Sequence, residues 1–498
     1  MKADVVVIGA GVAGASVTRE LSRYNVEVVL IDRECDACLG ASKANSAIVH
    51  AGYDDPPASL KSRLCVRGNA LYPQLMKDLG ASFERNGSLV VAFSKEDFET
   101  LGRLRSQGIT NGVPGLRILS GEEVREREPN LSDGVKGALW APTAGIISPY
   151  ELVMALCENA IHNGVVPMFS ARVEGISVKG GRVKEVHTDV GSVKTHFVIN
   201  AAGLYADDIA RMVGLKDFHI YPRKGEYFIF DKKVGSLVSA TVFPTPTPIS
   251  KGILVTHTVE GNTMIGPNAE TLDVKYKYAK EKNATTRDGL EEVFGGAIKL
   301  VPDLSRAMAI KNFAGLRPEP STGDFIIRAY DRVHGFINVA GIKSPGLTAA
   351  PAIAELAVEL LRYEGLELKT NDFDPYRQAP VRFADLMREE QEELIARDPR
   401  YGHVVCRCEH VTEGEIVDAI RAGARTLDGI KYRTRCGMGR CQGAFDTPRR
   451  AAILARELGI PLEQVTKRGK GSEVVMGELK GSEGKREEVK RREKIKKG

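Results

Sequence analysis

Long apolar runs are missing from this sequence, and aromatic side chains are few. Only one of the 498 residues is tryptophan. No stretch of about 18 consecutive apolar residues occurs, and a membrane-spanning helix would need one. The first residues, MKADVVVIGAG, also lack the longer apolar stretch and the cleavage site of a signal peptide. We therefore expect a cytoplasmic protein without a transmembrane segment.

An excess of one charge is also missing from most of the chain. The formal net charge is +5, but residues 480–498 alone contain nine Lys or Arg and four Glu. The remainder is close to neutral, which disfavours nucleic acid as a partner. Residues 469–498 show no apolar periodicity and predict a disordered basic tail. Docking of this tail on a partner or on an acidic lipid surface, as a peripheral membrane contact, is the alternative.

Cysteine is scarce outside one region. Four of the eight cysteines fall within 36 residues: Cys406, Cys408, Cys436 and Cys441. Disulfides are disfavoured in a cytoplasmic chain, so this clustering indicates a metal or cluster site. A separate C-x-x-C, Cys35 to Cys38, is either a redox-active or zinc-binding pair or two ordinary thiols.

The N-terminal segment contains a dinucleotide-binding pattern. A buried strand, expected over residues 5–8, is followed by G-x-G-x-x-G at Gly9, Gly11 and Gly14. These glycines permit a tight turn, a close approach to a pyrophosphate and close packing of the next helix. A second strand ends at Asp32, which can accept hydrogen bonds from a ribose. The pattern predicts a bound dinucleotide but does not separate NAD from FAD.

Later segments carry a more specific signal. The stretches NSAIVHAGYD, PRKGEYFIFD, GLRP and GIKSPGLTAAPAIA occur in this order along the chain. Together they resemble the FAD-dependent amine and hydroxy-acid oxidoreductases of the D-amino-acid oxidase superfamily, over about residues 3–370. Within it they are similar to the branch that holds anaerobic-type glycerol-3-phosphate dehydrogenases and L-2-hydroxyglutarate oxidases.

The resemblance implies FAD, which lies extended across the fold in that family. The resemblance and the turns around these motifs imply the following cofactor contacts: Gly9, Gly11, Gly14, Asp32, Arg33, Ser42, Asn45, Ser46, Ala47, Val173, Ala202, Gly203, Gly315, Gly341, Gly346, Leu347 and Thr348. The expected fold is α/β: a Rossmann-like FAD-binding domain with an inserted antiparallel-sheet substrate domain, followed by a small helical C-terminal domain. We place the FAD-binding domain at 1–75, 145–215 and 315–370, and the substrate domain at 76–144 and 216–314. Residues 371–400 are expected to be a linker.

Oxidation of a secondary alcohol needs a base for the hydroxyl proton. His50, five residues beyond Asn45, is the leading candidate, because a neutral imidazole suits this task. The alternative is a structural histidine that hydrogen-bonds the flavin or the backbone. His257 is a second candidate, but related sequences usually carry proline near this position, which puts its role in doubt.

An anionic substrate also needs cationic groups. Arg317, in GLRP, is the expected clamp, since a guanidinium binds a carboxylate or phosphate through two parallel hydrogen bonds; a structural ion pair is the alternative. Further donors are expected from Tyr53, Lys224, Tyr227 and Lys343. Two cations, Arg317 and Lys343, favour a phosphate. The expected reaction is oxidation of sn-glycerol 3-phosphate to dihydroxyacetone phosphate, with hydride passing to flavin N5.

The cysteine region is expected to fold as a unit over residues 401–468. Thr412 and Glu415 form a T-x-x-E capping box before a helix, and two further helices should begin near Thr426 and Thr447. Four thiolates can hold zinc or a [2Fe–2S] cluster, but C-x-C is tight for a zinc knuckle. The motifs CRCE and TRCGMGRCQG resemble the bacterioferritin-associated-ferredoxin-like [2Fe–2S] domain. Zinc and unligated thiols remain alternatives.

The cluster implies a destination for the electrons. A dehydrogenase must pass two electrons onward one at a time, and a cluster suits this relay. We expect an external acceptor, either a partner flavoprotein or an iron–sulfur subunit. The alternatives are a dehydrogenase for L-2-hydroxyglutarate or another hydroxy or amino acid, and an electron-transfer scaffold subunit without its own substrate.

Overall fold

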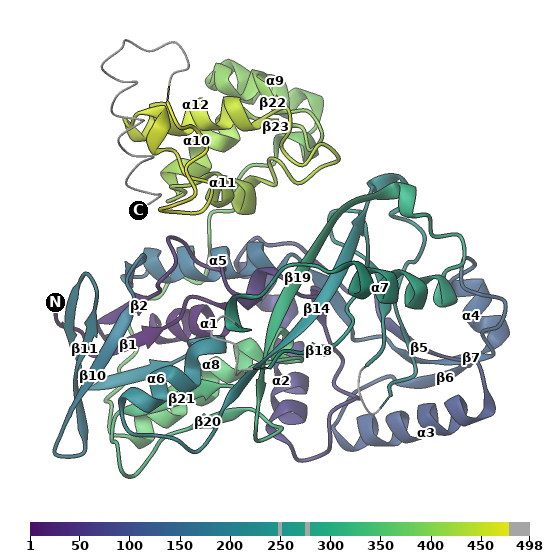
Figure 1. Ribbon diagram of the computed structural model, residues 1–498, viewed down its shortest axis with the longest axis horizontal. Coiled ribbons are helices and arrows are strands. Elements are labelled where there is room, and N and C mark those ends of the chain that lie inside the picture. The colour runs from purple at the N-terminus through teal and green to yellow at the C-terminus, as the bar shows by residue number, and fades with distance from the viewer. Residues whose placement is uncertain (248–250, 274–278, 478–498) are drawn as a thin grey trace, which may run out of the picture. The chain divides into compact units, whose positions relative to one another are not determined.

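The computed structural model describes residues 1–247, 251–273 and 279–477. The chain divides into two compact units, Met1–Ala379 and Pro380–Gly498, drawn in Figure 1. Most of the basic tail expected at 469–498 lies outside the described residues. No described helix combines the length and the apolar character needed to cross a membrane.

A mainly parallel sheet forms the centre of the first unit. Its strands, in spatial order, are β20 (Ile326–Arg328), β21 (Phe336–Ala340), β13 (Phe197–Asn200), β1 (Val5–Ile8), β2 (Val28–Ile31) and β9 (Val166–Met168). Only β20 runs antiparallel to its neighbour. All residues of β1 and β2 are buried, as their unbroken valine and isoleucine content requires for strands covered on both faces.

Helices cover one face of this sheet and a small sheet covers the other. Helix α1 (Val12–Leu21) packs against α8 (Gly346–Tyr363) and α5 (Pro149–His162), and α2 (Leu60–Asp78) packs on α8. The strands β10 (Val173–Lys179), β11 (Arg182–Thr188) and β12 (Gly191–Lys194) form the small sheet. Their valines share one core with β1, β2 and the short helix α6 (Ala206–Met212).

A second large sheet accounts for the rest of this unit. Within the described residues its strands run in the order β18 (Glu270–Thr271), β14 (Ile220–Phe230), β17 (Thr263–Gly266), β16 (Leu254–His257), β15 (Thr241–Pro244), β5 (Ser88–Ala92), β7 (Gly137–Ala141) and β6 (Arg117–Ser120), and β19 (Ala309–Pro320) also pairs with β14. Figure 1 shows β14 and β19 side by side over their length. The pairing is antiparallel except between β15 and β5.

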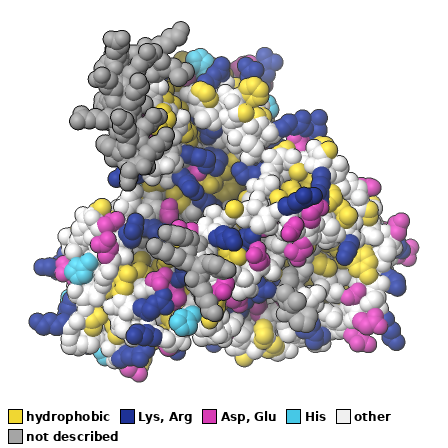
Figure 2. All heavy atoms as spheres, viewed as in Figure 1, with side chains coloured by type: hydrophobic (Ala, Val, Ile, Leu, Met, Phe, Trp, Pro, Cys, Tyr) yellow, Lys and Arg dark blue, Asp and Glu magenta, His cyan; other side chains and the backbone are white. Residues whose placement is uncertain are grey.

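Three helices pack beside the strands of this sheet: α3 (Lys95–Thr110), α4 (Gly121–Arg127) and α7 (Arg287–Leu300). A separate three-stranded sheet joins β3 (Ile48–Val49), β8 (Gly145–Ile147) and β4 (Phe83–Glu84). On the face seen in Figure 2, basic and acidic side chains are interspersed over the described residues of this unit. The two large sheets together confirm the α/β fold class expected from the sequence.

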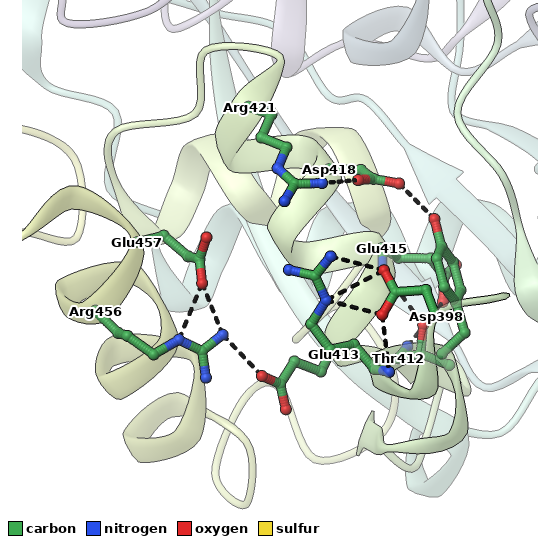
Figure 3. Close-up of polar contacts among 10 residues, drawn as sticks. Asp398, Thr412, Glu413, Glu415, Asp418, Arg421, Arg456 and Glu457 are labelled. Atoms are coloured by element: carbon green, nitrogen blue, oxygen red, sulfur yellow. Dashed lines mark hydrogen bonds and ion pairs between the residues drawn. The ribbon is translucent and has the colours of Figure 1, made fainter. Parts of the chain in front are cut away.

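The second unit is small and helical. It contains α9 (Arg388–Arg397), the hairpin β22 (Val404–Cys406) and β23 (Val411–Thr412), α10 (Glu413–Arg421), α11 (Leu427–Thr434) and α12 (Thr447–Leu458). The capping box expected at Thr412 and Glu415 is formed, and α10 begins there. Figure 3 shows Arg456 of α12 between Glu413 of α10 and Glu457, with ion pairs of 2.8 Å to each. These helices share a core that includes Cys406 and Cys436.

The segment expected as a linker, 371–400, is divided between the units. Phe373 lies under the guanidinium groups of Arg19 and Arg23, and Asn159 donates hydrogen bonds to the carbonyls of Asp374 and Tyr376. Residues 371–379 therefore belong to the first unit. The residues from Pro380 onward, including α9, belong to the second.

Candidate active site and cluster site

The glycine turn between β1 and α1 leaves no room for side chains. Gly9 has a φ of +107°, and a Cβ on it would lie 2.4 Å from the carbonyl oxygen of Ala201. A Cβ on Gly14 would lie 1.8 Å from the carbonyl oxygen of Gly9. The turn thus brings the N-terminus of α1 directly against the end of β13, where its backbone N–H groups can meet a pyrophosphate.

Two further predicted cofactor contacts lie at this turn. Ser42, in the short helix η1 (Ala41–Lys43), accepts a hydrogen bond from the N–H of Val12 at 2.9 Å. Asp32, at the end of β2, accepts from the N–H groups of Ala10 and Glu34 at 2.6 and 2.9 Å. Burial raises the pKa of Asp32, and these hydrogen bonds oppose that rise. These hydrogen bonds fix the carboxylate at the position where it would accept hydrogen bonds from the ribose of a dinucleotide.

The loop after η1 packs against the second large sheet. A Cβ on Gly315 of β19 would lie 2.0 Å from the carbonyl oxygen of Ala44, so this contact requires glycine. Asn45 accepts a hydrogen bond from the N–H of Ala47, whose φ is +61°. The hydroxyl of Tyr227 hydrogen-bonds Ser46, and its ring stacks on Phe313 at 4.6 Å. The predicted contacts in this loop are therefore adjacent.

The start of α8 carries three more of the predicted cofactor contacts: Gly346, Leu347 and Thr348. The Thr348 side chain is fully buried and accepts a hydrogen bond from the N–H of His50 at 2.8 Å. The carbonyl of Leu347 accepts from the Tyr72 hydroxyl at 2.5 Å. Gly346 begins the helix, so its free N–H groups face the same end of the sheet as those of α1.

The remaining predicted contacts lie around the same sheet edge. A Cβ on Gly9 would come within 3.1 Å of Ala202, which precedes Gly203. Val173 opens β10, two residues after Ala171 donates its N–H to the Asp32 carbonyl. Arg33 stacks on Tyr205 at 4.0 Å, and Gly341 follows β21 with a φ of +67°. Two helix N-termini, glycine-only contacts and a ribose acceptor on one edge fit an extended dinucleotide such as FAD.

A pocket opens beside His50 in the first unit. It is lined by the polar residues His50, Tyr53, Asp54 and Lys251 and by the apolar residues Val90, Leu104, Phe243, Pro244 and Pro246. Two of the predicted substrate-site residues, His50 and Tyr53, are therefore brought together here. The pocket has a charged end and an apolar wall, as sites for small polar ligands commonly do.

His50 is held rigidly and without charge. Its carbonyl accepts a hydrogen bond from Asn69 at 2.8 Å, and its Nε2 lies 3.4 Å from the hydroxyl of Ser344. Burial, helped by the nearby Lys251 ammonium, lowers the pKa of His50 to about 3. Since Ser344 belongs to the segment that begins α8, the imidazole lies between the pocket and the predicted flavin loop.

Lys251 and Asp54 form a half-buried ion pair that the sequence patterns did not predict. Their Nζ and Oδ2 atoms are 2.6 Å apart. Burial would lower the pKa of Lys251, but the carboxylates of Asp54 and Asp55 outweigh it and raise that pKa. The pair therefore stays charged inside the pocket. The only sequence signals were an isolated lysine in ISKGI and an acidic pair after Tyr53.

Arg317 lies on β19 opposite Arg223 of β14. It donates hydrogen bonds to the carbonyls of Lys224 and Asn268 at 3.0 and 2.7 Å. No acceptor for its Nη1 occurs in the part of the chain that the structure describes. Burial lowers the pKa of Arg317 without removing its charge. The guanidinium is oriented by the backbone and keeps one nitrogen available beside Tyr227.

Five of the predicted substrate-site residues are not among the lining residues of this pocket: Lys224, Tyr227, His257, Arg317 and Lys343. Lys224 is 1% exposed and is paired with Glu226 and Glu270, each at 2.8 Å. Because alternate residues of a strand face opposite sides, Lys224 points away from Arg223 and Tyr227. This placement removes Lys224 from the expected substrate site.

His257 and Lys343 are both engaged by carboxylates. The Nε2 of His257 lies 3.1 Å from Glu84, and His257 is not among the lining residues of the pocket. Lys343 forms an ion pair with Glu319, the neighbour of Arg317 two positions along β19. His257 thus lies outside the lining of this pocket, whereas Lys343 is paired with a residue of the strand that carries Arg317.

The four clustered cysteines lie on two loops of the second unit. The Sγ atoms of Cys406 and Cys436 lie within 4.8 Å of each other and of an Asp446 oxygen. A hydrogen bond from Cys436 lowers the pKa of Cys406 to about 7. Cys408 and Cys441 form a second hydrogen-bonded pair that is less buried. Each thiol pair thus combines one cysteine of the first loop, Cys406 or Cys408, with one of the second loop, Cys436 or Cys441.

The loops are shaped for close approach around these thiols. A Cβ on Gly439 would lie 2.3 Å from the Cβ of Cys408, so the loops touch where only glycine fits. The non-glycine residues His410, Arg435 and Gln442, which lie near the cysteines, all have positive φ angles, between +49° and +65°. Such conformations are costly and concentrate at functional sites. Four thiols in this cradle fit a [2Fe–2S] cluster.

Known proteins share both parts of the chain. Residues 404–455 match the family model of the BFD-like [2Fe-2S] binding domain. A glycerol 3-phosphate dehydrogenase of Caloramator mitchellensis is 47% identical over 480 residues, which are 96% of this chain and 99% of that protein. A glycerol 3-phosphate oxidase of Mycoplasma genitalium is 31% identical over 74% of this chain and 96% of its own length.

Among solved structures, the dithionite-reduced L-α-glycerophosphate oxidase of Mycoplasma pneumoniae with FAD bound superposes with a TM-score of 0.71. It is 31% identical and covers 76% of this chain and 98% of its own. The family model described as FAD dependent oxidoreductase matches residues 4–360. With its glycine turn, its second helix N-terminus and its two-sheet fold, the chain belongs to this FAD-dependent oxidoreductase family.

Proposed function

We propose that this protein oxidises sn-glycerol 3-phosphate to dihydroxyacetone phosphate as a dehydrogenase. The observation that carries the proposal is the neutral His50 beside the charged Lys251, in one pocket next to the predicted flavin loop. A base and a cation close together are what a hydroxylated phosphate ester needs. The dehydrogenase that is 47% identical over nearly the whole chain supports the same substrate.

His50 is proposed to accept the proton of the substrate hydroxyl. Its Nε2 is the atom that faces Ser344, and burial keeps that atom unprotonated in the free pocket. A phosphate dianion bound nearby favours the imidazolium, so substrate binding raises the pKa of His50 toward the range of an effective base. Ser344 can hold the hydroxyl or the imidazole in line.

The phosphate is proposed to bind Lys251 and Arg317. The side chain of Lys251 is half-buried at the pocket, so a second anion there gains a charge-assisted interaction with its ammonium. Arg317 is oriented by backbone carbonyls and has Nη1 available. Tyr53 lines the same pocket, and burial raises the pKa of its hydroxyl to about 12, so it remains a donor at neutral pH.

FAD, when bound, supplies the acceptor for the electron pair of the substrate C–H bond. The residues proposed to hold it are those of the glycine turn, Asp32, the Ser42–Ala47 loop and the start of α8. The apolar wall formed by Val90, Leu104 and Phe243 excludes water from the reacting hydroxyl. The described residues of the pocket thus bind, orient and deprotonate the substrate.

The electron acceptor is proposed to be an external protein. The oxidase of Mycoplasma genitalium is matched over 96% of its length by 74% of this chain, so its unmatched part is too short for a cluster domain. The dehydrogenase of Caloramator mitchellensis is matched over 99% of its length by nearly all of this chain. The cluster domain of this chain therefore has no counterpart in the oxidase, and a flavoprotein or an iron–sulfur protein is the proposed partner.

The test is anaerobic reduction of the bound flavin by single substrates. We expect sn-glycerol 3-phosphate to bleach the flavin absorbance, and L-2-hydroxyglutarate and proline to leave it unchanged at equal concentration. L-2-hydroxyglutarate is included because relatives of that activity reach 31% identity. Bleaching by L-2-hydroxyglutarate alone would refute the proposed substrate. His50→Gln should slow the reduction at least ~100-fold without loss of FAD.

A further inference from the structure

Asp446 occupies an unusual place in the cluster-binding unit. It is the N-cap residue of α12, but its side chain accepts no hydrogen bond from the helix. An aspartate at this position ordinarily accepts one from the first helical turn. The carboxylate is instead 1% exposed and lies within 4.8 Å of the Sγ atoms of Cys406 and Cys436. Helix capping therefore does not explain its position.

Arg450, one turn further along α12, is the counterion. Its side chain is 5% exposed, and its Nε lies 2.7 Å from Oδ1 of Asp446. Its Nη1 donates a hydrogen bond to the carbonyl of Cys436 at 3.2 Å. A Cβ on Gly437 or Gly443 would come within 2.7 Å of the guanidinium. The cation is thus packed into the loop that carries Cys436 and Cys441.

The rest of the surroundings leaves the carboxylate with little other stabilisation. Apart from the ion pair with Arg450, the carboxylate interacts with the Cys406 thiol, through a hydrogen bond. A buried charge with a single countercharge is costly, and it acts strongly on other charges nearby because water does not screen it. When the cluster is bound, the charges nearest to this carboxylate, apart from Arg450, are those of the four thiolates and of the cluster that they hold.

We propose that Asp446 and Arg450 form a charge-balanced pair that sets the reduction potential of the [2Fe–2S] cluster. A cluster with four thiolate ligands is an anion, and one-electron reduction adds one negative charge without any bond change. A carboxylate beside it disfavours that charge and a guanidinium favours it, so the two residues shift the potential in opposite directions. The inference rests on the cluster and not on the substrate proposed above.

The test is a redox titration of the full-length protein, with the cluster followed by electron paramagnetic resonance. Asp446→Asn removes the carboxylate and should raise the potential; Arg450→Gln should lower it. Each change should alter the equilibrium constant with a fixed one-electron mediator at least tenfold, which is about 59 mV for a one-electron couple. The double variant should lie between the two single variants.

Matched controls separate charge from structure. Arg449→Gln removes the same charge from the exposed neighbouring position, and solvent screening should limit its effect to less than threefold. Arg450→Lys keeps the charge and should stay closer to the unsubstituted protein than Arg450→Gln. If Arg450→Gln fails to retain its cluster, Asp446→Asn and Arg450→Lys still decide the question. Iron and acid-labile sulfide contents show whether each variant is loaded.

Three results would overturn the proposal. The potential could move in the same direction in Asp446→Asn and Arg450→Gln, or by no more than in Arg449→Gln. Alternatively, Asp446→Asn could lose iron, which would make Asp446 a ligand and not a source of charge. Because the readout is a potential, failure of the substrate assignment would leave all three outcomes interpretable.

Discussion

The charge states of His50 and Lys251 differ because different groups surround their side chains in the pocket. Both side chains are half-buried, and desolvation alone disfavours the charged form of each. Desolvation outweighs the influence of the Asp54 carboxylate on His50, which is neutral, whereas Lys251 lies 2.6 Å from Asp54 and stays charged. The chain thus provides an acceptor for a proton and a site for an anion side by side.

The neutral state of His50 predicts a pH dependence of stability. Its pKa is about 3 in the folded protein, against about 6.5 for an unfolded chain. The unfolded state therefore binds the proton first as the pH falls, and stability is lost from about pH 6.5 downward. Urea midpoints at pH 7 and pH 5 should fall more for the unsubstituted protein than for His50→Gln. The exposed His196→Gln, as control, should behave like the unsubstituted protein.

Lys251 predicts a change in substrate affinity. Removing the ammonium alone would leave the half-buried Asp54 without its counterion, so the informative comparison is Asp54→Asn against Asp54→Asn with Lys251→Met. Loss of a charge-assisted contact costs about 1.5–3 kcal/mol, so KM for glycerol 3-phosphate should rise by about 10- to 100-fold in the double variant. Glycerol, which lacks the phosphate, should show no such difference. Equal KM values for glycerol 3-phosphate would remove Lys251 from the site.

At the scale of elements, the β14–β19 ladder decides which side chains can meet. Arg223 is opposite Arg317, and Tyr227 is opposite Phe313, so these residues share the face that meets the loop after η1. Lys224 and Glu226 alternate to the other face, where Thr286 before α7 donates to Glu226. One register therefore places a cation at the site and buries another away from it.

The glycine turn predicts loss of the cofactor when a methyl group is added. In Gly9→Ala the new Cβ would meet the Ala201 carbonyl at 2.4 Å, in a backbone conformation that alanine rarely adopts. The purified variant should contain much less FAD per chain, measured from the flavin absorbance. Gly423→Ala has nearly the same φ, of +108°, but no atom within 4 Å, and should retain the flavin. Full FAD content in Gly9→Ala would contradict the assignment of this turn.

Local patterns explain which parts of the site were predictable. The glycine turn, Asp32 and the cysteine loops are contiguous, and each carries its chemistry within a few residues. Asp54 and Ser344 lie within the motifs NSAIVHAGYD and GIKSPGLTAAPAIA, but the motifs do not show which of their residues lie beside His50, and Lys251 comes from a distant segment without such a motif. Lys224 was misplaced because strand character predicts alternation but not which face is buried. That choice depends on the register with β19.

At the scale of the whole molecule, the two units divide the reaction. The first matches proteins that include oxidases of almost the same length, and the second matches a cluster domain. Substrate oxidation and electron delivery should therefore be separable by substitution in the intact chain.

The variant Cys408→Ser should separate substrate oxidation from electron delivery. Loss of one thiolate should deplete iron and acid-labile sulfide, while glycerol 3-phosphate still reduces the flavin at a rate within about twofold of the original. Reoxidation by a one-electron protein acceptor should slow at least ~10-fold. Cys35→Ser, outside the cluster region, should change neither rate. Unslowed reoxidation in Cys408→Ser would mean that electrons leave directly from the flavin.

The dispersed layout of the first unit has a consequence during synthesis. Helix α1 packs against α8, and β13 pairs with β21, although the second member of the α1–α8 pair is made roughly 300 residues later. At ~5–20 residues per second, a ribosome needs on the order of tens of seconds to supply it. Throughout that interval the face of α1 that packs on α8 lacks its partner, although β2 and α5 are made earlier. The nascent chain therefore exposes this apolar face for longer than local folding of β1, α1 and β2 alone would require.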